Sequence, residues 1–161
     1  MVKVGDMATN AAASPSTVGT PSHRIVVGTD GSTASLLALE WAAHQAELTG
    51  ASLEVIAVWH WPNTFGWGSI PNDFNPANDA RDILEPAIAT VEKAHPDVAV
   101  SYKIVEGHPA LELVAASKGA ELLVVGSRGH GEFTGMLIGS TSEYCVANAA
   151  CPVVVIRGNY S

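Results

Sequence analysis

Five glycines lie within nineteen residues between Val124 and Ser142, in a stretch that reads VVGSRGHGEFTGMLIGSTS. The stretch continues directly from an apolar run, Leu122 to Val125. Glycines that follow a buried strand allow backbone N–H groups to approach a phosphate closely. These residue types therefore indicate an anion-binding loop, and their spacing decides which kind of loop it is.

Three known phosphate-binding loops do not fit the spacing. A Walker loop has four residues between its glycines, followed by Lys and then Ser or Thr, but no lysine occurs after Lys118. The dinucleotide pattern G-x-G-x-x-G, built on Gly129 and Gly131, requires a glycine where Thr134 stands. The glycine-rich loop of protein kinases has the same pattern and fails for the same reason.

The pattern that remains is Gly126-x2-Gly129-x9-Gly139-Ser140, which joins the end of a predicted strand to the start of a predicted helix. A segment with this course can place several N–H groups around one anion, and the helix dipole adds a favourable potential. Ser140 has a second possible role, because Ser140-Thr-Ser-Glu143 fits a capping box in which its hydroxyl satisfies the helix's own N–H groups. Both roles are compatible with the sequence.

The surrounding chain predicts alternating strands and helices. Ser32 is a suitable N-cap for the first helix and Gly50 a suitable residue to end it, whereas Pro86 is expected to bend or split the second. The predicted strands are 25–27, 53–59, 98–105 (with Val98, Val100, Tyr102 and Ile104 alternating), 122–125 and 153–156, and the predicted helices are 34–48, 79–95, 110–118 and about 140–150. This order indicates an α/β fold in which helices cover both faces of a mostly parallel sheet.

The chain is predicted to hold one domain, residues 23–158, between a disordered N-terminal tail, 1–22, and a short C-terminal tail, 159–161. Residues 60–79 form a long connection rich in Pro, Gly and Asn. Its aromatic residues indicate that it folds back onto the domain, as a satellite hydrophobic cluster in preference to a ligand contact. These residues are Trp61, Phe65, Trp67 and Phe74.

Composition limits the partners. Sixteen acidic and eight basic residues give a formal charge of −8, which argues against binding to nucleic acid or to an anionic membrane. No apolar run has the length of a membrane span, and the N-terminal segment lacks the apolar middle of a signal peptide, so a cytoplasmic location is expected. Cys145 and Cys151 are expected to be small buried thiols in preference to a disulfide or a zinc site.

Four separated segments together resemble the universal stress protein family. They are the turn Val27-Gly-Thr-Asp-Gly-Ser32, the turn Gly107-His-Pro109, the glycine pattern and the strand Cys151-Pro-Val-Val-Val-Ile156. The glycine pattern is the mark of that family's ATP-binding branch. The resemblance implies an open, Rossmann-like sheet of order 3-2-1-4-5, ATP as the ligand, and a homodimer formed through Val153–Ile156. It is compatible with Mg²⁺ or Mn²⁺ bound through the phosphates.

The resemblance also implies a site where the winding of the sheet reverses, outside the carboxyl ends of the first and fourth strands. It assigns Gly28, Thr29 and Asp30 to the nucleoside, Val58 to the adenine, Gly126, Arg128, Gly129, His130 and Gly131 to the ribose and phosphates, and Gly139, Ser140 and Thr141 to the phosphates. From the residues alone, Asp30 could instead form only an Asx turn before Gly31. Arg128 and His130 could be solvated loop residues, and Gly126 and Gly129 could serve turn geometry.

Catalysis is not expected from this stretch. The Walker lysine is missing, and Glu132 is the only carboxylate within the loop, so a general base for hydrolysis is not evident. A triad of Ser127, His130 and Asp30 is disfavoured because Ser127 does not lie in a G-x-S-x-G turn. The expected function is therefore ATP binding in stress response or signalling, with slow hydrolysis at most. The alternatives are a sensor of another adenine nucleotide, such as cyclic AMP, and an interaction module with a vestigial pocket.

Overall fold

The computed structural model describes residues 23–61, 73–127 and 138–158. The predictions for both tails, for Phe65 and Trp67, and for Arg128, Gly129, His130 and Gly131 lie outside these residues. The elements in chain order are β1 (Arg24–Gly28), α1 (Thr33–Thr49), β2 (Ser52–Trp59), α2 (Pro76–Ala94), β3 (Val100–Glu106), α3 (Pro109–Ala116), β4 (Leu122–Gly126), α4 (Ser140–Asn148) and β5 (Val153–Ile156).

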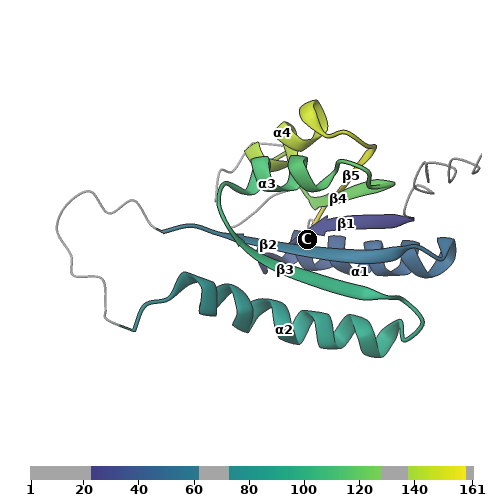
Figure 1. Ribbon diagram of the computed structural model, residues 1–161, viewed down its shortest axis with the longest axis horizontal. Coiled ribbons are helices and arrows are strands. Elements are labelled where there is room, and N and C mark those ends of the chain that lie inside the picture. Colours follow the sequence, from purple (N-terminus) through teal and green to yellow (C-terminus); the bar gives the residue numbers. More distant parts are fainter. Residues whose placement is uncertain (1–22, 62–72, 128–137, 159–161) are drawn as a thin grey trace, which may run out of the picture.

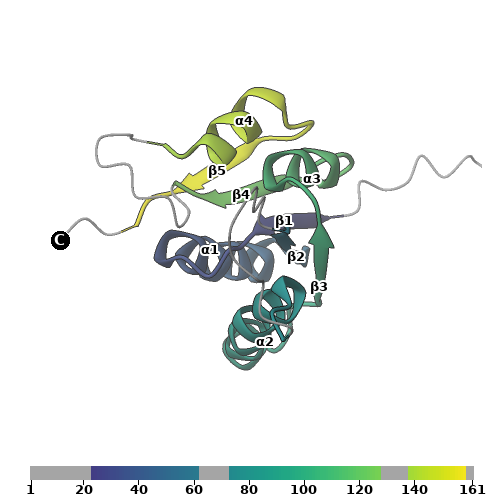
Figure 2. The ribbon, with the colours of Figure 1, turned by 90° about the vertical axis from the view of Figure 1, so that its left-hand side faces the viewer.

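The five strands form one parallel sheet of order β3-β2-β1-β4-β5, which confirms the predicted fold class and strand order. Helices α1 and α2 cover one face of the sheet, and α3 and α4 cover the other (Figures 1 and 2). Each face has its own apolar core, around Val27 and Leu53 on the first side and around Val26 and Leu123 on the second. The central strands are continuous apolar runs because both of their faces are buried.

Helix α1 begins and ends where local sequence chemistry predicts. Ser32 has an extended backbone, and its hydroxyl accepts a hydrogen bond from the N–H of Ser35. Gly50 follows the helix with a φ of 72°, the left-handed conformation that glycine adopts at little cost. These two capping residues therefore fix where α1 begins and ends.

Helix α2 corrects two expectations. It begins at Pro76, where the Asn75 side chain accepts hydrogen bonds from two N–H groups, so the end of the 60–79 connection belongs to the helix. It also continues through Pro86, and the prediction of a split is wrong. Pro86 lies on the exposed side of α2, where water can satisfy the backbone carbonyl that loses its partner.

The other aromatic residues of the same connection give a mixed picture. The rings of Trp59 and Trp61 meet edge to face, with centroids 5.8 Å apart. Trp61 and Phe74 nevertheless remain 48% and 38% exposed. Of the connection's aromatic residues that the structure describes, Trp61 therefore makes a ring contact beside the end of β2. The other, Phe74, stays at the surface.

Three further boundaries differ from the sequence prediction, and one is the end of α3, which falls at Ala116 and not at Lys118. Strand β3 starts at Val100, and Val98 is instead buried in the preceding turn, where its N–H donates to the carbonyl of His95. The expected alternation is also weak, because β3 is an edge strand and its Tyr102 is 45% exposed. Helix α4 ends at Asn148, two residues earlier than expected.

The two cysteines are free thiols, as expected. Cys145 is fully buried in the core beneath α4, and burial raises the pKa of its thiol to about 11. Cys151 is only partly buried, which departs from the prediction. Burial also raises its pKa.

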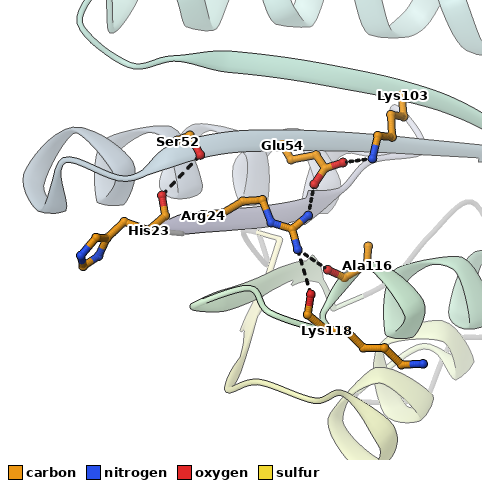
Figure 3. Close-up of polar contacts among 7 residues, drawn as sticks. All are labelled: His23, Arg24, Ser52, Glu54, Lys103, Ala116 and Lys118. Atoms are coloured by element: carbon orange, nitrogen blue, oxygen red, sulfur yellow. Dashed lines mark hydrogen bonds and ion pairs between the residues drawn. The ribbon is translucent and has the colours of Figure 1, made fainter. Parts of the chain in front are cut away.

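A buried carboxylate ties three strands to α3 at the amino end of the sheet (Figure 3). Glu54, with a side chain 6% exposed, is bonded by Arg24 from β1 and by Lys103 from β3. The other arm of Arg24 donates to the carbonyls of Ala116 and Lys118, both at 3.0 Å, and so caps the carboxyl end of α3. Burial acts to raise the pKa of Glu54, but the hydrogen bonds from Lys103 and Arg24 outweigh it, and the pKa is lowered.

Candidate functional site

The winding of the sheet reverses between β1 and β4, which are paired through Val27 and Val124. The loops that follow these strands therefore leave the same edge of the sheet, the place where open α/β sheets bind ligands. The structure brings together there Gly28, Thr29, Asp30, Gly126, Gly139, Ser140 and Thr141.

The turn after β1 is held by a short network of hydroxyl groups. The N–H of Thr29 donates to the carbonyl of Ile56 at 3.0 Å, which continues the pairing with β2 by one residue. The hydroxyls of Thr29 and Ser35, both buried, lie 3.1 Å apart, and the N–H of Asp30 donates to Ser35 Oγ at 3.3 Å. The first turn of α1 thus fixes the backbone of Thr29 and Asp30.

Asp30 forms the Asx turn that was one of its two possible roles. Its Oδ1 accepts hydrogen bonds from the N–H of Ser32 at 2.9 Å and from the hydroxyl of the same residue at 2.5 Å. Asp30 itself is exposed. A structural role is therefore established for this side chain, and it lies on the surface at the strand reversal, where a ligand can reach it.

Gly31 completes this turn and links it to α2. Its φ of 79° is one that residues with side chains rarely adopt. A Cβ placed on Gly31 would lie 2.5 Å from Cγ2 of Ile83, so the Ile83 side chain rests against the backbone of the turn. Only glycine fits both the backbone conformation and the available space.

Gly126 is required by packing and not by turn geometry. Its backbone is not among the positive-φ glycines of the described residues. A Cβ at this position would lie 2.7 Å from the carbonyl carbon of Ala34 and 2.8 Å from the nitrogen of Ser35. These are backbone atoms of α1, so the absence of a side chain is what lets the start of α1 lie directly against the end of β4.

The start of α4 lies on another side of the same glycine. The Ser142 hydroxyl donates to the carbonyl of Gly126, and the N–H of Gly139 donates to the carbonyl of Ser127 at 2.6 Å. Gly139 is the N-cap, with a φ of −72° that any residue can adopt, and it supplies no side chain. The predicted capping box is therefore wrong: Ser140 is the first helical residue, and its hydroxyl does not cap α4.

This arrangement leaves the first turn of α4 without an acceptor. Within the described part of the chain, no hydrogen bond satisfies the N–H groups of Ser140, Thr141 and Ser142. The amino end of α1 packs against Gly126 from its own side, so two helix amino ends converge on one strand end. Each carries a partial positive charge, and the site therefore favours an anion.

Ser127 is a site residue that sequence reasoning did not select. It is 2% exposed, and its N–H and carbonyl are bonded to Ile156 and Gly139. Its hydroxyl, however, has no hydrogen-bond partner in the described ranges. A buried hydroxyl without a partner costs about 1–3 kcal/mol, so an acceptor or donor from beyond the described residues is expected there. In the sequence, only its position directly after Gly126 could have marked Ser127 as a site residue. Its burial also argues against a role as a nucleophile.

Val58 occupies the end of β2 next to β1. It lies two residues beyond Ile56, which pairs with Gly28, and therefore extends past the end of β1. Its side chain is half-buried on the α3 side of the sheet, beside the core that contains Leu113. The position offers an apolar surface at the edge of the site, next to the turn of Thr29 and Asp30.

The described residues show no group of three or more His, Cys, Asp or Glu side chains placed to bind a metal ion. These residues also contain no helix that is long and apolar enough to cross a membrane. Both findings apply only to the parts of the chain that the structure describes.

Residues 21–157 match the model of the universal stress protein family. The chain belongs to this family. The universal stress protein Rv2623 of Mycobacterium tuberculosis is 37% identical over 135 residues, which cover 83% of this chain and 44% of that protein. A universal stress protein of Mycolicibacterium smegmatis is 36% identical over 138 residues, covering 83% and 45%. This universal stress protein thus spans less than half the length of these curated relatives.

Solved structures of the family have the same fold as this universal stress protein. One, described as a universal stress protein in complex with cAMP, is 26% identical with a TM-score of 0.65, and the match covers 85% of this chain and 98% of that one. Another, from Burkholderia pseudomallei, is 27% identical with a TM-score of 0.59, covering 86% and 98%. A third, from Archaeoglobus fulgidus in complex with dAMP, is 23% identical with a TM-score of 0.60, covering 83% and 96%, and supports the fold alone.

Proposed function

We propose that this universal stress protein binds ATP at the β1–β4 reversal and acts by binding and not by turnover. The observation that carries the proposal is the set of unsatisfied donors at this edge. The N–H groups of Ser140, Thr141 and Ser142 and the buried hydroxyl of Ser127 have no protein partner in the described residues. Phosphate oxygens are acceptors and carry negative charge, so they satisfy both requirements at once.

In the proposed complex the phosphates lie at the start of α4 and the nucleoside lies toward β2. Thr29, Asp30 and Val58 border that second region, where an exposed carboxylate can accept hydrogen bonds from ribose hydroxyls and an apolar side chain can contact the adenine. The contacts of Arg128, Gly129, His130 and Gly131 remain predictions from the glycine pattern. A divalent cation, Mg²⁺ or Mn²⁺, would be held through the phosphates.

The family relative that is described in complex with cAMP supports an adenine nucleotide as the class of ligand. It also keeps a cyclic nucleotide as the second candidate. Three N–H groups and a hydroxyl suit a phosphate of either nucleotide, and the triphosphate is favoured by the glycine pattern, which resembles that of the family's ATP-binding branch. Binding without turnover is supported by Asp30, whose carboxylate already accepts two hydrogen bonds from Ser32 within its own turn.

We further propose a cytoplasmic homodimer formed through β5. This strand, Val153–Ile156, is at the edge of the sheet, and all four of its apolar residues are only partly buried. An apolar edge strand promotes association unless another element covers it. Light scattering at micromolar concentration is expected to give twice the mass of the chain, and a monomer would contradict this part of the proposal.

The nucleotide proposal is tested by calorimetric titration with ATP and Mg²⁺, together with chromatographic identification of any nucleotide that co-purifies. The variant Gly139→Leu is expected to abolish ATP uptake and keep the fold, because the φ of −72° accepts a side chain. Ala147→Leu, exposed on the same helix, is the control and is expected to bind normally. If the unaltered protein takes up no ATP, the proposal is wrong; if cyclic AMP displaces ATP at lower concentration, the cyclic nucleotide is the ligand.

A further inference from the structure

His95 joins the carboxyl end of α2 to the neighbouring helix α1. It is 7% exposed, its Nδ1 lies 2.8 Å from Oε2 of Glu47, and its Nε2 lies 3.4 Å from Oε1 of Glu40. The two glutamates are two helical turns apart and so share one side of α1. A single imidazole therefore bridges two carboxylates of the adjacent helix.

The bridge is complete only when His95 is protonated. A neutral imidazole has one N–H donor and one lone pair, so it can donate to one carboxylate and must turn its lone pair toward the other. The imidazolium ion donates to both, in charge-assisted bonds. The hydrogen bond to Glu47 raises the pKa of His95, burial lowers it, the bond to Glu40 raises it further, and the net shift is upward.

Among the residues that the structure describes, few other charged groups lie near this bridge. On α1, His44 lies between the two glutamates, with its ring centroid 6.2 Å from that of His95 and its Nδ1 3.9 Å from Glu47. On the segment that carries His95, the charged residues Lys93 and Asp97 are exposed. The charges of β2 and β3 in this part of the sheet, Glu54 and Lys103, lie on the opposite face, where Glu54 is bonded to Lys103 and to Arg24, which also caps α3. The protonation of His95 is thus controlled mainly by the two glutamates.

Between its two ends, α2 packs incompletely against α1. The helices leave an apolar groove of about 330 Å³ whose walls include Leu36 and Leu39 of α1 and Ile83, Pro86 and Ala87 of α2. Leu84, Ile88 and Val91 hold α2 on the sheet, in the core that contains Leu53 and Val55 of β2, so the contacts beside the groove set only where α2 lies relative to α1. His95 supplies the contact at one end.

Ile83, which lies in the amino-terminal half of α2 and borders the groove, supplies the contact to the proposed nucleotide site. It rests against Gly31, directly beside Asp30, and is itself 45% exposed, so its position follows that of α2. Ile83 and His95 are twelve residues apart, or about 18 Å along a helix that moves as a rigid unit. A change in the docking of α2 therefore reaches the turn of Asp30 through Ile83.

We propose that protonated His95 anchors α2 to α1, and that α2, through Ile83, positions the Gly31 turn, so that nucleotide affinity falls as His95 loses its proton. The second step rests on the proposed nucleotide function, whereas the first does not. Because the pKa of His95 is raised in the folded protein, the anchor is fully present below the unfolded value near 6.5 and is lost as the pH rises through the folded value.

The anchoring step is tested without nucleotide, by NMR titration of the His95 ring and by amide hydrogen exchange in α2 corrected for the intrinsic effect of pH. We expect His95 to titrate above 6.5 in the unaltered protein and closer to 6.5 in Glu47→Gln. Exchange near the carboxyl end of α2 is expected to accelerate once His95 is neutral. The anchor is overturned if His95 titrates at or below 6.5. It is also overturned if amide exchange in α2 does not change as His95 titrates.

The coupling step is tested by titrating the protein with ATP and Mg²⁺ between pH 6 and 9. The unaltered protein is expected to lose about fivefold or more in affinity across the His95 titration. His95→Gln is expected to bind ATP weakly across this pH range and to lack the loss of affinity that follows the titration of His95. The titration of ATP itself affects both proteins equally. His44→Gln is the control and should keep the normal profile, and Ile83→Ala should weaken ATP binding while the titration of His95 stays unchanged.

Outcomes of the two experiments separate the two proposals. If the protein binds no ATP at all, the proposed function fails, and the anchor is still judged by the NMR and exchange data. If ATP binds and His95→Gln retains the full pH profile, the coupling is wrong. Should His95→Gln fail to fold, the double variant Glu40→Gln with Glu47→Gln removes the same charge-assisted bonds, and retention of the full profile in that protein overturns the coupling equally.

Discussion

Replacing Gly126 with alanine should force the start of α1 away from the end of β4. The new Cβ would lie 2.7 Å from the carbonyl carbon of Ala34, whereas ordinary contacts begin near 3.4 Å. Relief requires a displacement of about 0.7 Å, and the atoms in the way are main chain and cannot rotate aside. Because Ser32 and Ser35 in this first turn of α1 hold the Asp30 turn, the displacement reaches the nucleotide site as well.

The expected loss of stability follows from two opposing effects. Forcing an extra carbon into a well-packed region costs about 1–3 kcal/mol. Replacing glycine by alanine also restricts the unfolded chain, which stabilises the folded state by about 0.4–1 kcal/mol. The net destabilisation of Gly126→Ala is therefore about 1–2 kcal/mol, or roughly 2–8 °C in the melting temperature of a domain of this size.

Urea denaturation, followed by fluorescence and circular dichroism, measures this difference in the free energy of unfolding. Gly158→Ala is a matched control, since its Cβ would meet only the Cβ of the same Ala34, at an ordinary 3.8 Å. It is expected to unfold within about 0.5 kcal/mol of the unaltered protein. Equal stability of the two variants would refute the argument that Gly126 exists for the close approach of α1.

Three further predictions concern features away from the glycine loop. Glu54→Gln should lower the free energy of unfolding by about 1–3 kcal/mol at neutral pH, because it removes a charged hydrogen-bond acceptor. The pKa of Glu54 is lowered in the folded protein, so this difference from the unaltered protein should shrink as the pH falls below 4.5 and through the folded value. Denaturation measured over a series of acidic pH values checks this. Gly50→Ala should cost about 1 kcal/mol in urea denaturation through its left-handed backbone alone, because its Cβ would enter open space, and an unchanged midpoint would contradict this. A thiol reagent at pH 7.5 should leave Cys145 unmodified in the folded protein, given its pKa of about 11, so Cys151→Ala should be almost unlabelled until urea is added.

The sequence is most informative where a local rule acts alone. Ser32 and Gly50 fix the ends of α1 because a side-chain hydroxyl and a left-handed glycine act within one turn of the helix. The apolar runs of β1 and β4 predict a sheet covered on both faces, and their order with the helices predicts parallel pairing. The order of the strands, by contrast, came from the family resemblance, and the structure confirms it.

The expectations that failed depend on atoms outside the local segment. The spacing of Ser140 and Glu143 fits a capping box, yet the chain enters α4 one residue earlier, at Gly139, where bonds to Ser127 and Gly126 place it. Pro86 was expected to bend or split a helix, and the split does not occur, because α2 continues through Pro86 on its exposed side. In both cases the sequence pattern is compatible with more than one structure, and packing selects one of them.

For the site, the sequence pattern by itself indicated only that loops after parallel strands share the carboxyl edge of the sheet, and the family resemblance supplied the neighbouring strands β1 and β4. Only the tertiary structure decided why Gly126 must be glycine, that Ser127 is buried and bonded to Ile156, and that His95 lies between Glu40 and Glu47. These facts join residues from about 30 to more than 90 positions apart in the chain. Contacts at such separation are set by how helices and strands pack, and no pattern within one segment encodes that packing.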